Sequence, residues 1–256
     1  MYILTPNYGN QEIGSYAPNM SEFSKFSALS FDCYGTLIDW ESGIANELLD
    51  WTTKNKFEVS REQVLVDFSE YEASAEREFP DLIYPKVLAK AMEGLSSQYA
   101  IPATAEDLAT FGNSVPRWPA FPDSAEALKL LKQKFKLIIL SNVDRNSFAA
   151  SNKKLEVEFD AIITAQDVGA YKPRLDGFHL LAKTVKDLGV PQGGLLHVAQ
   201  SLFHDHVPAK QVGLSTVWIN RRHNDPGWGA TPAPSAEVKP DWTFNSMIEF
   251  AKAATL

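Results

Sequence analysis

Short apolar runs alternate with amphipathic segments through the second half of the chain. Buried strands of a parallel sheet are continuously apolar, whereas the helices that cover them carry apolar positions three or four residues apart. The pattern therefore predicts an α/β fold with a Rossmann-like, mostly parallel sheet covered on both faces. The predicted strands are 27–31, 137–140, 161–165, 195–198 and 216–220, and the predicted helices are 123–135, 175–188 and one that starts near residue 245.

A block between the first and second predicted strands shows only helical patterns. This block covers residues 42–118 and contains no strand-like run. Three prolines within 115–122 exclude a continuous helix there and mark a linker back to the sheet. We therefore predict an α/β core formed by residues 26–41 and 119–256, interrupted by an inserted all-helical subdomain at 42–118.

Composition narrows the classes of function. The 256 residues are 45% hydrophobic and 22% charged, which suits a sizeable core plus a smaller subdomain. The net charge of -8 comes from interspersed signs without a basic stripe, so we expect no nucleic-acid partner. No apolar run reaches transmembrane length and no signal-like segment is present, so we expect no membrane association. Residues 1–25 are polar and lack a period, which predicts an N-terminal arm.

Asp32 ends the first predicted strand, and Gly35 and Thr36 behind it indicate a tight turn. Ligands of open α/β sheets bind beyond the carboxyl ends of the strands, where a carboxylate can attack a substrate and form an ester that water cleaves. The alternative is that Asp32 only caps the turn. Cys33 is the only cysteine, so no intrachain disulfide can form and a reducing, cytoplasmic compartment fits. It should point away from Asp32 as a small buried apolar residue.

Polar residues in two later stretches of the chain favour the catalytic interpretation of Asp32. Ser141 and Asn142 follow the second predicted strand, where a hydroxyl and an amide can hold an anionic group, although both types also cap helices. Lys172 precedes Pro173, which keeps the local chain extended. A lysine there can pair with Asp32, lower the pKa of its carboxyl and hold one oxygen for attack. Otherwise Lys172 is an exposed loop residue.

The segment 197–209 has the pattern of a strand, a polar turn and a helix start. This arrangement predicts that Ser201 and Asp205 lie near the same crevice, although an acidic residue in a first helical turn also has an electrostatic reason to be there. His204 and His206 have a spacing found in metal sites, but on a helix start their side chains would diverge. We therefore expect them at the surface or in support of other residues rather than on a metal.

Four segments in one order resemble the four motifs of the haloacid dehalogenase-like superfamily. They are Phe31–Leu37, Leu140–Asn142, Val168–Pro173 and Ala199–Asp205. The helical insertion is similar in position to the cap of that superfamily, and the likeness spans about residues 27–250. The resemblance implies an α/β core with a helical cap and a small-molecule site that contains a nucleophilic aspartate.

Two chemistries occur in that superfamily, and the motif residues separate them. Phosphatases carry a second Asp two positions after the nucleophile and an acidic Gly-Asp pair for Mg²⁺, whereas this chain has Tyr34 and Ala199-Gln200 there. Phosphoryl transfer needs charge neutralisation, so these replacements predict a poor Mg²⁺ site. The form with Tyr34 resembles the metal-independent L-2-haloacid dehalogenases, which implies no cofactor. Mg²⁺ belongs only to the phosphatase alternative.

The resemblance to the dehalogenases implies a role for each motif residue. Asp32 would be the nucleophile, Lys172 would be its ion pair, and Thr36 would donate a hydrogen bond to it. Asp205 would place or activate water. The residues implied to face the substrate are Tyr34 on the halide side, Ser141 and Asn142 at the substrate carboxylate, Ser201 at a position that assists hydrolysis, and Arg77 as the nearest basic side chain of the cap.

The chain departs from the dehalogenase pattern on the leaving-group side. Ser69 stands where the dehalogenases place a halide-binding Arg, and Phe178 stands in place of a Tyr. Ala199 and Ser201 replace a Ser and an Asn of the fourth motif. The leading hypothesis is a metal-independent hydrolase that acts on the carbon–halide bond of a 2-haloacid or a related small carboxylate. The alternatives are a Mg²⁺-dependent phosphatase and a repurposed protein of secondary metabolism without hydrolytic activity. The resemblance also implies a homodimer through the cap helices.

Overall fold

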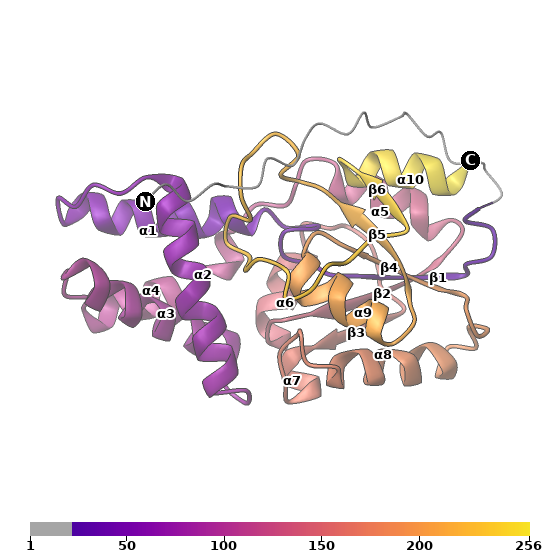
Figure 1. Cartoon of the computed structure of the whole chain (residues 1–256), viewed down its shortest axis with the longest axis horizontal. Helices are drawn as coiled ribbons and strands as arrows, with labels where there is room; N and C mark the ends of the chain where they lie inside the picture. Colours follow the sequence, from indigo (N-terminus) through magenta and orange to yellow (C-terminus); the bar gives the residue numbers. More distant parts are fainter. Residues whose placement is uncertain (1–21) are drawn as a thin grey trace.

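Two lobes form the described part of the chain, which is residues 22–256 of the computed structural model (Figure 1). One lobe is an α/β domain, and the other, which we call the cap, is built from helices. The predicted arm 1–25 lies outside the described residues except for 22–25, where Phe23 is buried with its ring centroid 5.0 Å from that of Trp242. The predicted fold class is confirmed.

A six-stranded parallel sheet forms the centre of the α/β lobe, with the strands in the order β3-β2-β1-β4-β5-β6. The chain leaves β1 toward β2 and β3, then returns to the other side of β1 for β4. This reversal opens a crevice at the carboxyl ends of β1 and β4, where ligands bind in open α/β sheets. The strands are β1 (Ala28–Phe31), β2 (Lys136–Ser141), β3 (Ala161–Thr164), β4 (Leu195–Ala199), β5 (Ser215–Ile219) and β6 (Trp242–Phe244).

Helices cover both faces of this sheet because its strands are apolar on both sides. They are α5 (Ser124–Lys132), α6 (Arg145–Asn152), α7 (Ala165–Val168), α8 (Asp176–Asp187), α9 (Val207–Gln211) and α10 (Met247–Thr255). Leu137 and Ile139 of β2 join the core cluster that contains α5 and α10, whereas Ile138 and Leu140 join a second cluster with α8, on the opposite face (Figure 1). The short elements α6, α7 and β6 are absent from the sequence prediction because each is too short to show a hydrophobic period, whereas α9 begins within the helix start predicted in 197–209.

The cap consists of four helices and one helical turn. These are α1 (Trp40–Lys54), α2 (Arg61–Glu78), α3 (Tyr84–Tyr99), α4 (Ala105–Gly112) and η1 (Val115–Arg117). Ser60 begins α2, since its side chain accepts a hydrogen bond from the Gln63 N–H at 3.2 Å. Thr104 begins α4 with a reciprocal capping box that includes Asp107. Pro80 follows the end of α2, as a residue that cannot continue a helix does.

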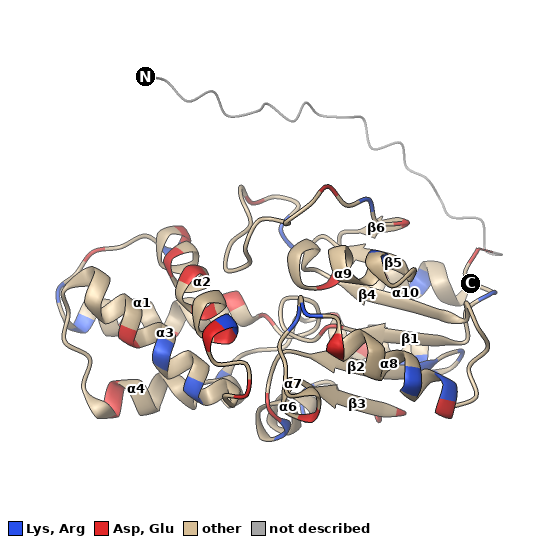
Figure 2. Cartoon of the chain, turned by 60° about the horizontal axis from the view of Figure 1, so that its bottom comes forward, with Lys and Arg blue, Asp and Glu red and all other residues tan. Residues whose placement is uncertain are grey.

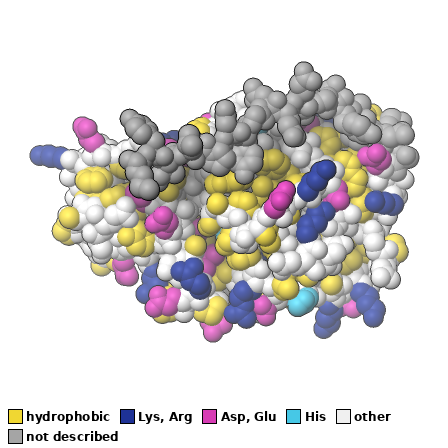
Figure 3. All heavy atoms as spheres, in the orientation of Figure 1, with side chains coloured by type: hydrophobic (Ala, Val, Ile, Leu, Met, Phe, Trp, Pro, Cys, Tyr) yellow, Lys and Arg dark blue, Asp and Glu magenta, His cyan; other side chains and the backbone are white. Residues whose placement is uncertain are grey.

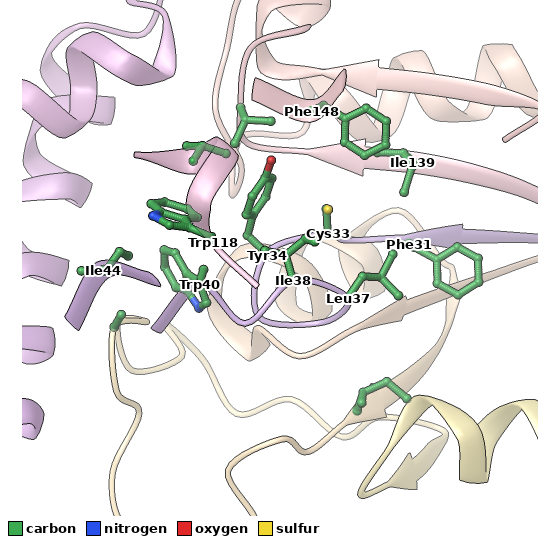
Figure 4. Close-up of a cluster of buried hydrophobic side chains, with 14 of the residues drawn as sticks. Phe31, Cys33, Tyr34, Leu37, Ile38, Trp40, Ile44, Trp118, Ile139 and Phe148 are labelled. Carbon is green, nitrogen blue, oxygen red and sulfur yellow. The ribbon is translucent and has the colours of Figure 1, made fainter. Parts of the chain in front are cut away.

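The two connections between the lobes run side by side. Asp39 donates its N–H to the Pro119 carbonyl at 2.8 Å, and Phe121 donates to Leu37 at 3.0 Å. Aromatic rings fill the junction above them (Figure 4). Trp118 from the returning connection approaches α1 so closely that a side chain at Gly43 would collide with its ring. These contacts fix the cap over the carboxyl end of β1.

The surface carries both signs of charge. Figure 3 shows basic and acidic side chains interspersed over the face in view rather than segregated into one patch. This distribution is the one expected from the composition. Within residues 22–256, no helix combines the length and the apolar character that crossing a membrane requires.

Candidate active site

Asp32 lies at the carboxyl end of the central strand, where one backbone and one side-chain hydrogen bond with the neighbouring chain segments hold it. Its N–H donates to the Val198 carbonyl of β4 at 3.1 Å, which extends the sheet pairing by one residue. Gly35, with a φ of +94°, turns the chain so that Thr36 comes back to the carboxylate. The Thr36 hydroxyl donates to Asp32 Oδ2 at 2.8 Å and accepts the Gln200 N–H at 2.9 Å. Thr36 therefore joins the first and fourth motifs at the carboxylate.

Lys172 is buried and bridges two carboxylates. Its Nζ donates to Asp32 Oδ1 at 2.9 Å, to Asp205 Oδ1 at 2.7 Å and to the Leu140 carbonyl at 3.1 Å. Asn142 holds the Lys172 backbone from both sides: its Oδ1 accepts the Lys172 N–H at 2.7 Å, and its Nδ2 donates to the Lys172 carbonyl at 3.1 Å. All three ammonium hydrogens are thus used, and the position of the charge is fixed.

Burial and ion pairing act in opposite directions on this cluster. Burial raises the pKa of Asp32 above its usual value, and the ammonium of Lys172 opposes this effect. Lys172 lowers the pKa of Asp32 as expected, but burial has the larger effect, so the net shift is upward. The two carboxylates raise the pKa of Lys172 despite its burial, so it stays charged. At Asp205, burial raises the pKa of the carboxyl. The charge of Lys172 and the hydrogen bonds from His197 and Lys172 have the larger combined effect and lower it.

Asp205 sits in a short π-helical turn, η2 (Leu202–His206), that follows β4. Besides Lys172, its Oδ1 has His197 Nε2 at 3.1 Å, and the opposite ring nitrogen of His197 lies 2.8 Å from Ser30 Oγ. The second oxygen, Oδ2, is buried and has no hydrogen-bond partner among the described residues. A buried carboxylate oxygen without a partner is costly, so this atom is suited to accept a hydrogen bond from a water molecule or a ligand.

A cavity lies over these residues and between the two lobes. The cavity volume open to solvent is about 30 Å³, which is room for about two water molecules. A cavity of this kind suits a small ligand rather than a polymer. Both lobes and the long loop after β5 contribute to its wall. The lining residues are Asp32, Tyr34, Trp40, Glu72, Glu76, Tyr84, Asn142, Val143, Lys172, Ser201, His204, Asp205 and Thr231.

Of the remaining sequence-predicted residues, some line the cavity and others do not. Tyr34 lines the cavity, and its hydroxyl lies 2.8 Å from Ser151 Oγ. Ser201 also lines the cavity, and its Oγ accepts the His204 N–H at 2.9 Å. Ser141 does not line the cavity, although its buried Oγ has no hydrogen-bond partner among the described residues. Asp32, Lys172, Asp205 and Thr36 therefore form one bonded cluster, with Tyr34, Asn142 and Ser201 around it.

Arg77 requires a correction. We expected it to be the basic side chain of the cap nearest the substrate, but it is exposed and contacts Ser74 instead of the cavity. The helical period explains the result, since Glu72 and Glu76 are four residues apart on the inner face of α2 and Arg77 is rotated by about 100° from Glu76. The cap therefore presents acids, not a guanidinium, to the cavity. Figure 2 shows acidic positions along much of α2.

The sequence analysis missed Glu72, Glu76 and their neighbour Tyr84. The Tyr84 hydroxyl donates to Glu72 Oε1 at 2.5 Å, and Asn142 Nδ2 lies 3.5 Å from both oxygens of Glu76. Burial raises the pKa of Glu72 to about 8 and, together with the charge of Glu72, raises that of Glu76 well above its usual value. The signal was present, because the two acids continue the spacing of the apolar residues Leu65 and Phe68 on one helix face.

His204 and His206 diverge, as expected for a helical turn. His204 lines the cavity, whereas His206 is buried with Nε2 3.0 Å from the Ala199 carbonyl. A surface position is therefore wrong for His206. Burial lowers the pKa of both rings to about 4, so both are neutral at pH 7. Over residues 22–256, no group of three or more His, Cys, Asp or Glu side chains is arranged to hold a metal ion. Cys33 is buried among apolar side chains (Figure 4).

Comparison with known proteins identifies the class to which this fold and site belong. Residues 26–193 match the family model of haloacid dehalogenase-like hydrolases, so the chain belongs to this hydrolase family. It is similar to haloacid dehalogenase-like hydrolase domain-containing protein 3 of Xenopus laevis, with 26% identity over 131 residues, which is 50% of this chain and 52% of that protein. The chain thus spans about half the length of that relative.

A second relative and a solved structure extend the likeness over most of the chain. Haloacetate dehalogenase H-2 of Moraxella sp. (strain B) is 25% identical over 201 residues, covering 77% of this chain and 87% of that protein. The crystal structure of the L-2-haloacid dehalogenase RSc1362 superposes with a TM-score of 0.73 at 22% identity, covering 90% of this chain and 99% of that one. The resemblance found in the motifs is therefore confirmed at the level of family and fold.

Proposed function

We propose that the protein is a metal-independent hydrolase in which Asp32 attacks a saturated carbon of a small carboxylate. A carboxylate oxygen of Asp32 would form a bond to that carbon, and the leaving group would depart with the electrons of the broken bond. Water would then attack the carbonyl carbon of the resulting ester, release the hydroxylated product and restore Asp32. The buried bridge from Lys172 to Asp32 and Asp205 is the observation that carries this proposal.

The bridge supports each half of the reaction. Lys172 and Thr36 hold one oxygen each of Asp32, so the carboxylate is oriented before the substrate binds. Asp205 keeps Oδ2 free within the same cavity, where it can accept a hydrogen bond from the water that cleaves the ester. Its lowered pKa makes Asp205 a group that positions this water rather than a strong base.

The donor set also supports a reaction without a metal ion. A divalent cation of the phosphatase type would need the carboxylates of Asp32 and Asp205, but the ammonium of Lys172 already lies within 2.9 Å of one and 2.7 Å of the other. The ammonium therefore already supplies a positive charge between the two Oδ1 atoms. Ala199 and Gln200 supply no further carboxylate at the end of β4.

The names of the relatives suggest which substrate to test first. Haloacetate and L-2-haloacids are small carboxylates with a halide on the carbon next to the carboxyl group. We therefore propose carbon–halide hydrolysis of a 2-haloacid or a related compound. Asn142 at the cavity wall, with Ser141 beside it, is proposed to hold the carboxylate of that substrate.

The experiment is halide release from L-2-chloropropionate in the presence of a chelator. We expect turnover by the wild-type protein and none by Asp32→Asn, with the same circular dichroism spectrum for both. Asp50→Asn is the matched control, because Asp50 is exposed on α1 and pairs with the exposed Lys54, away from the cavity. Turnover by Asp32→Asn at more than one tenth of the wild-type rate would contradict the proposal.

A further inference from the structure

The cap wall of the cavity is acidic. Glu72 and Glu76 are 4% and 8% exposed and line the cavity together with Asp32 and Asp205. Among the described lining residues, Lys172 is the only lysine or arginine, and its ammonium hydrogens are used by the aspartates and a carbonyl. The two cap acids therefore have no basic side chain of the cavity as a partner.

The two acids differ in their hydrogen bonds. Glu72 accepts a short hydrogen bond from Tyr84, which anchors it to α3. Glu76 has only the amide of Asn142 at 3.5 Å, the outer limit of a hydrogen bond. A buried carboxyl with such weak partners is more stable with its proton than without it, because the charged form would be desolvated and unpaired. The unpartnered Oδ2 of Asp205 is a second sign that this cavity is built for a polar ligand.

A carboxylic acid opposite a nucleophile changes which leaving groups the site can handle. A halide departs as a stable anion and needs no proton, whereas an alkoxide is a strong base and departs readily only when it is protonated. A positioned general acid contributes about 10² to 10⁴ in rate. A buried acid facing Asp32 therefore suits carbon–oxygen cleavage better than carbon–halide cleavage.

We propose that Glu76 donates a proton to an oxygen leaving group, so that the protein also opens the ring of small epoxides that carry a carboxylate. The inference rests on the proposed function, because Asp32 is the nucleophile in both reactions. Glu72 is a positioning residue, since its nearby acidic group favours the protonated form of Glu76 without touching the substrate.

The reaction balances with water as the only co-reactant. A carboxylate oxygen of Asp32 forms a bond to a ring carbon while the bond from that carbon to the epoxide oxygen breaks. The epoxide oxygen takes the electron pair and receives the proton of Glu76. Water then cleaves the Asp32 ester, and the proton released in that step restores Glu76. The sum is epoxide plus water to diol.

The ionisation of the acids agrees with this assignment. Burial and the charge of Glu72 raise the pKa of Glu76 well above its usual value, and burial raises that of Glu72 to about 8. Glu76 is therefore protonated at neutral pH, and epoxide opening should slow at the alkaline pH at which Glu76 loses its proton. The titratable groups that face the two acids are Tyr84 of α3, Asp32 and Tyr34 after β1, Tyr171 and Lys172 after α7, and His204 and Asp205 of η2.

The test compares two substrates with the same three-carbon skeleton. The probes are L-2-chloropropionate, followed by chloride release, and both enantiomers of glycidate (oxirane-2-carboxylate), followed by glycerate formation. The proteins are the wild type, Glu76→Gln and Glu78→Gln, the last being the matched control because Glu78 is exposed on the same helix. Circular dichroism spectra check that each variant is folded.

We expect the wild type to form glycerate from one enantiomer, with a kcat that falls at alkaline pH as Glu76 loses its proton. In Glu76→Gln the ratio of the glycidate kcat to the chloropropionate kcat should fall by at least about 100-fold, while Glu78→Gln keeps the wild-type ratio. Chloride release without glycerate formation would overturn the role of Glu76 and leave the proposed function standing. If the wild type releases no chloride and forms no glycerate, both the role of Glu76 and the proposed function would be overturned. If Glu76→Gln does not fold, the pH profile of the wild type decides, and a glycidate kcat that falls at no alkaline pH at which chloride release is retained would overturn the inference.

Discussion

Glu72 should make the stability of the protein depend on pH, and Glu72→Gln should remove that dependence. Its carboxyl is 4% exposed, and burial raises its pKa from 4.5 to about 8. Between these two values the folded protein keeps a proton that the unfolded chain releases. The unfolded state then binds fewer protons than the folded state, so the free energy of unfolding falls as the pH rises.

The size of the effect follows from the shift. A rise of about 3.5 pKa units corresponds to about 5 kcal/mol over the whole range, because each unit is worth about 1.36 kcal/mol. Between pH 5 and pH 7.5 the unfolded glutamate is mostly ionised while the folded one keeps most of its proton. This residue alone should therefore lower the free energy of unfolding by about 3 kcal/mol over that interval. In Glu72→Gln this titration is absent, and the amide oxygen can still accept the hydrogen bond from Tyr84.

Urea unfolding followed by circular dichroism measures this difference. We expect the wild type to lose stability relative to the variant as the pH rises. The difference between their free energies of unfolding should change by about 3 kcal/mol from pH 5 to pH 7.5. Other carboxyls that titrate equally in both proteins cancel in this comparison. Glu78→Gln is the control and should run parallel to the wild type, because Glu78 is exposed on the same helix. Parallel curves for the wild type and Glu72→Gln would refute the reasoning that burial governs this carboxyl.

Three further predictions concern the cluster, the metal and the assembly. Lys172→Met should lower the kcat for chloropropionate by about 10²- to 10³-fold. It should also lower the free energy of unfolding by about 3–5 kcal/mol, because two buried carboxylates lose their shared cation. An unchanged kcat would contradict the role of Lys172. Addition of EDTA should leave chloride release unchanged, whereas a loss restored by Mg²⁺ would favour the phosphatase alternative. Light scattering should give the mass of two chains, and a mass near 28.4 kDa would reject the proposed homodimer.

Much of the fold could be predicted from the sequence because the longer elements repeat their hydrophobic period several times. The helix predicted at 175–188 is observed at Asp176–Asp187, and the strand predicted at 137–140 is observed at Lys136–Ser141. Strand β6 (Trp242–Phe244) shows the limit, since three residues at a sheet edge carry no period. Their place in the sheet depends on pairing with β5, which is a tertiary contact.

The candidate site, like the fold, could be predicted from the sequence only in part. The contact between Lys172 and Asp32 could be anticipated, because both residues follow motifs that the parallel topology brings to one edge of the sheet. The spacing of Glu72 and Glu76 from the apolar face of α2 indicates their inward direction, but α2 is acidic over much of its length, so the sequence alone does not single out these two acids as residues of the cavity. The expectation for Arg77 rests on its charge and its position in the cap, and one residue of helical rotation places its side chain in solvent.

The central claim is that Asp32 bonds covalently to its substrate, and one measurement tests it most directly. The protein is incubated in excess over L-2-chloropropionate in ¹⁸O-water, digested and analysed by mass spectrometry. Our account predicts ¹⁸O in the peptide that contains Asp32, since water attacks the carbonyl carbon of the ester. Product that carries ¹⁸O while the Asp32 peptide remains unlabelled would contradict the account, because water would then have attacked the substrate itself.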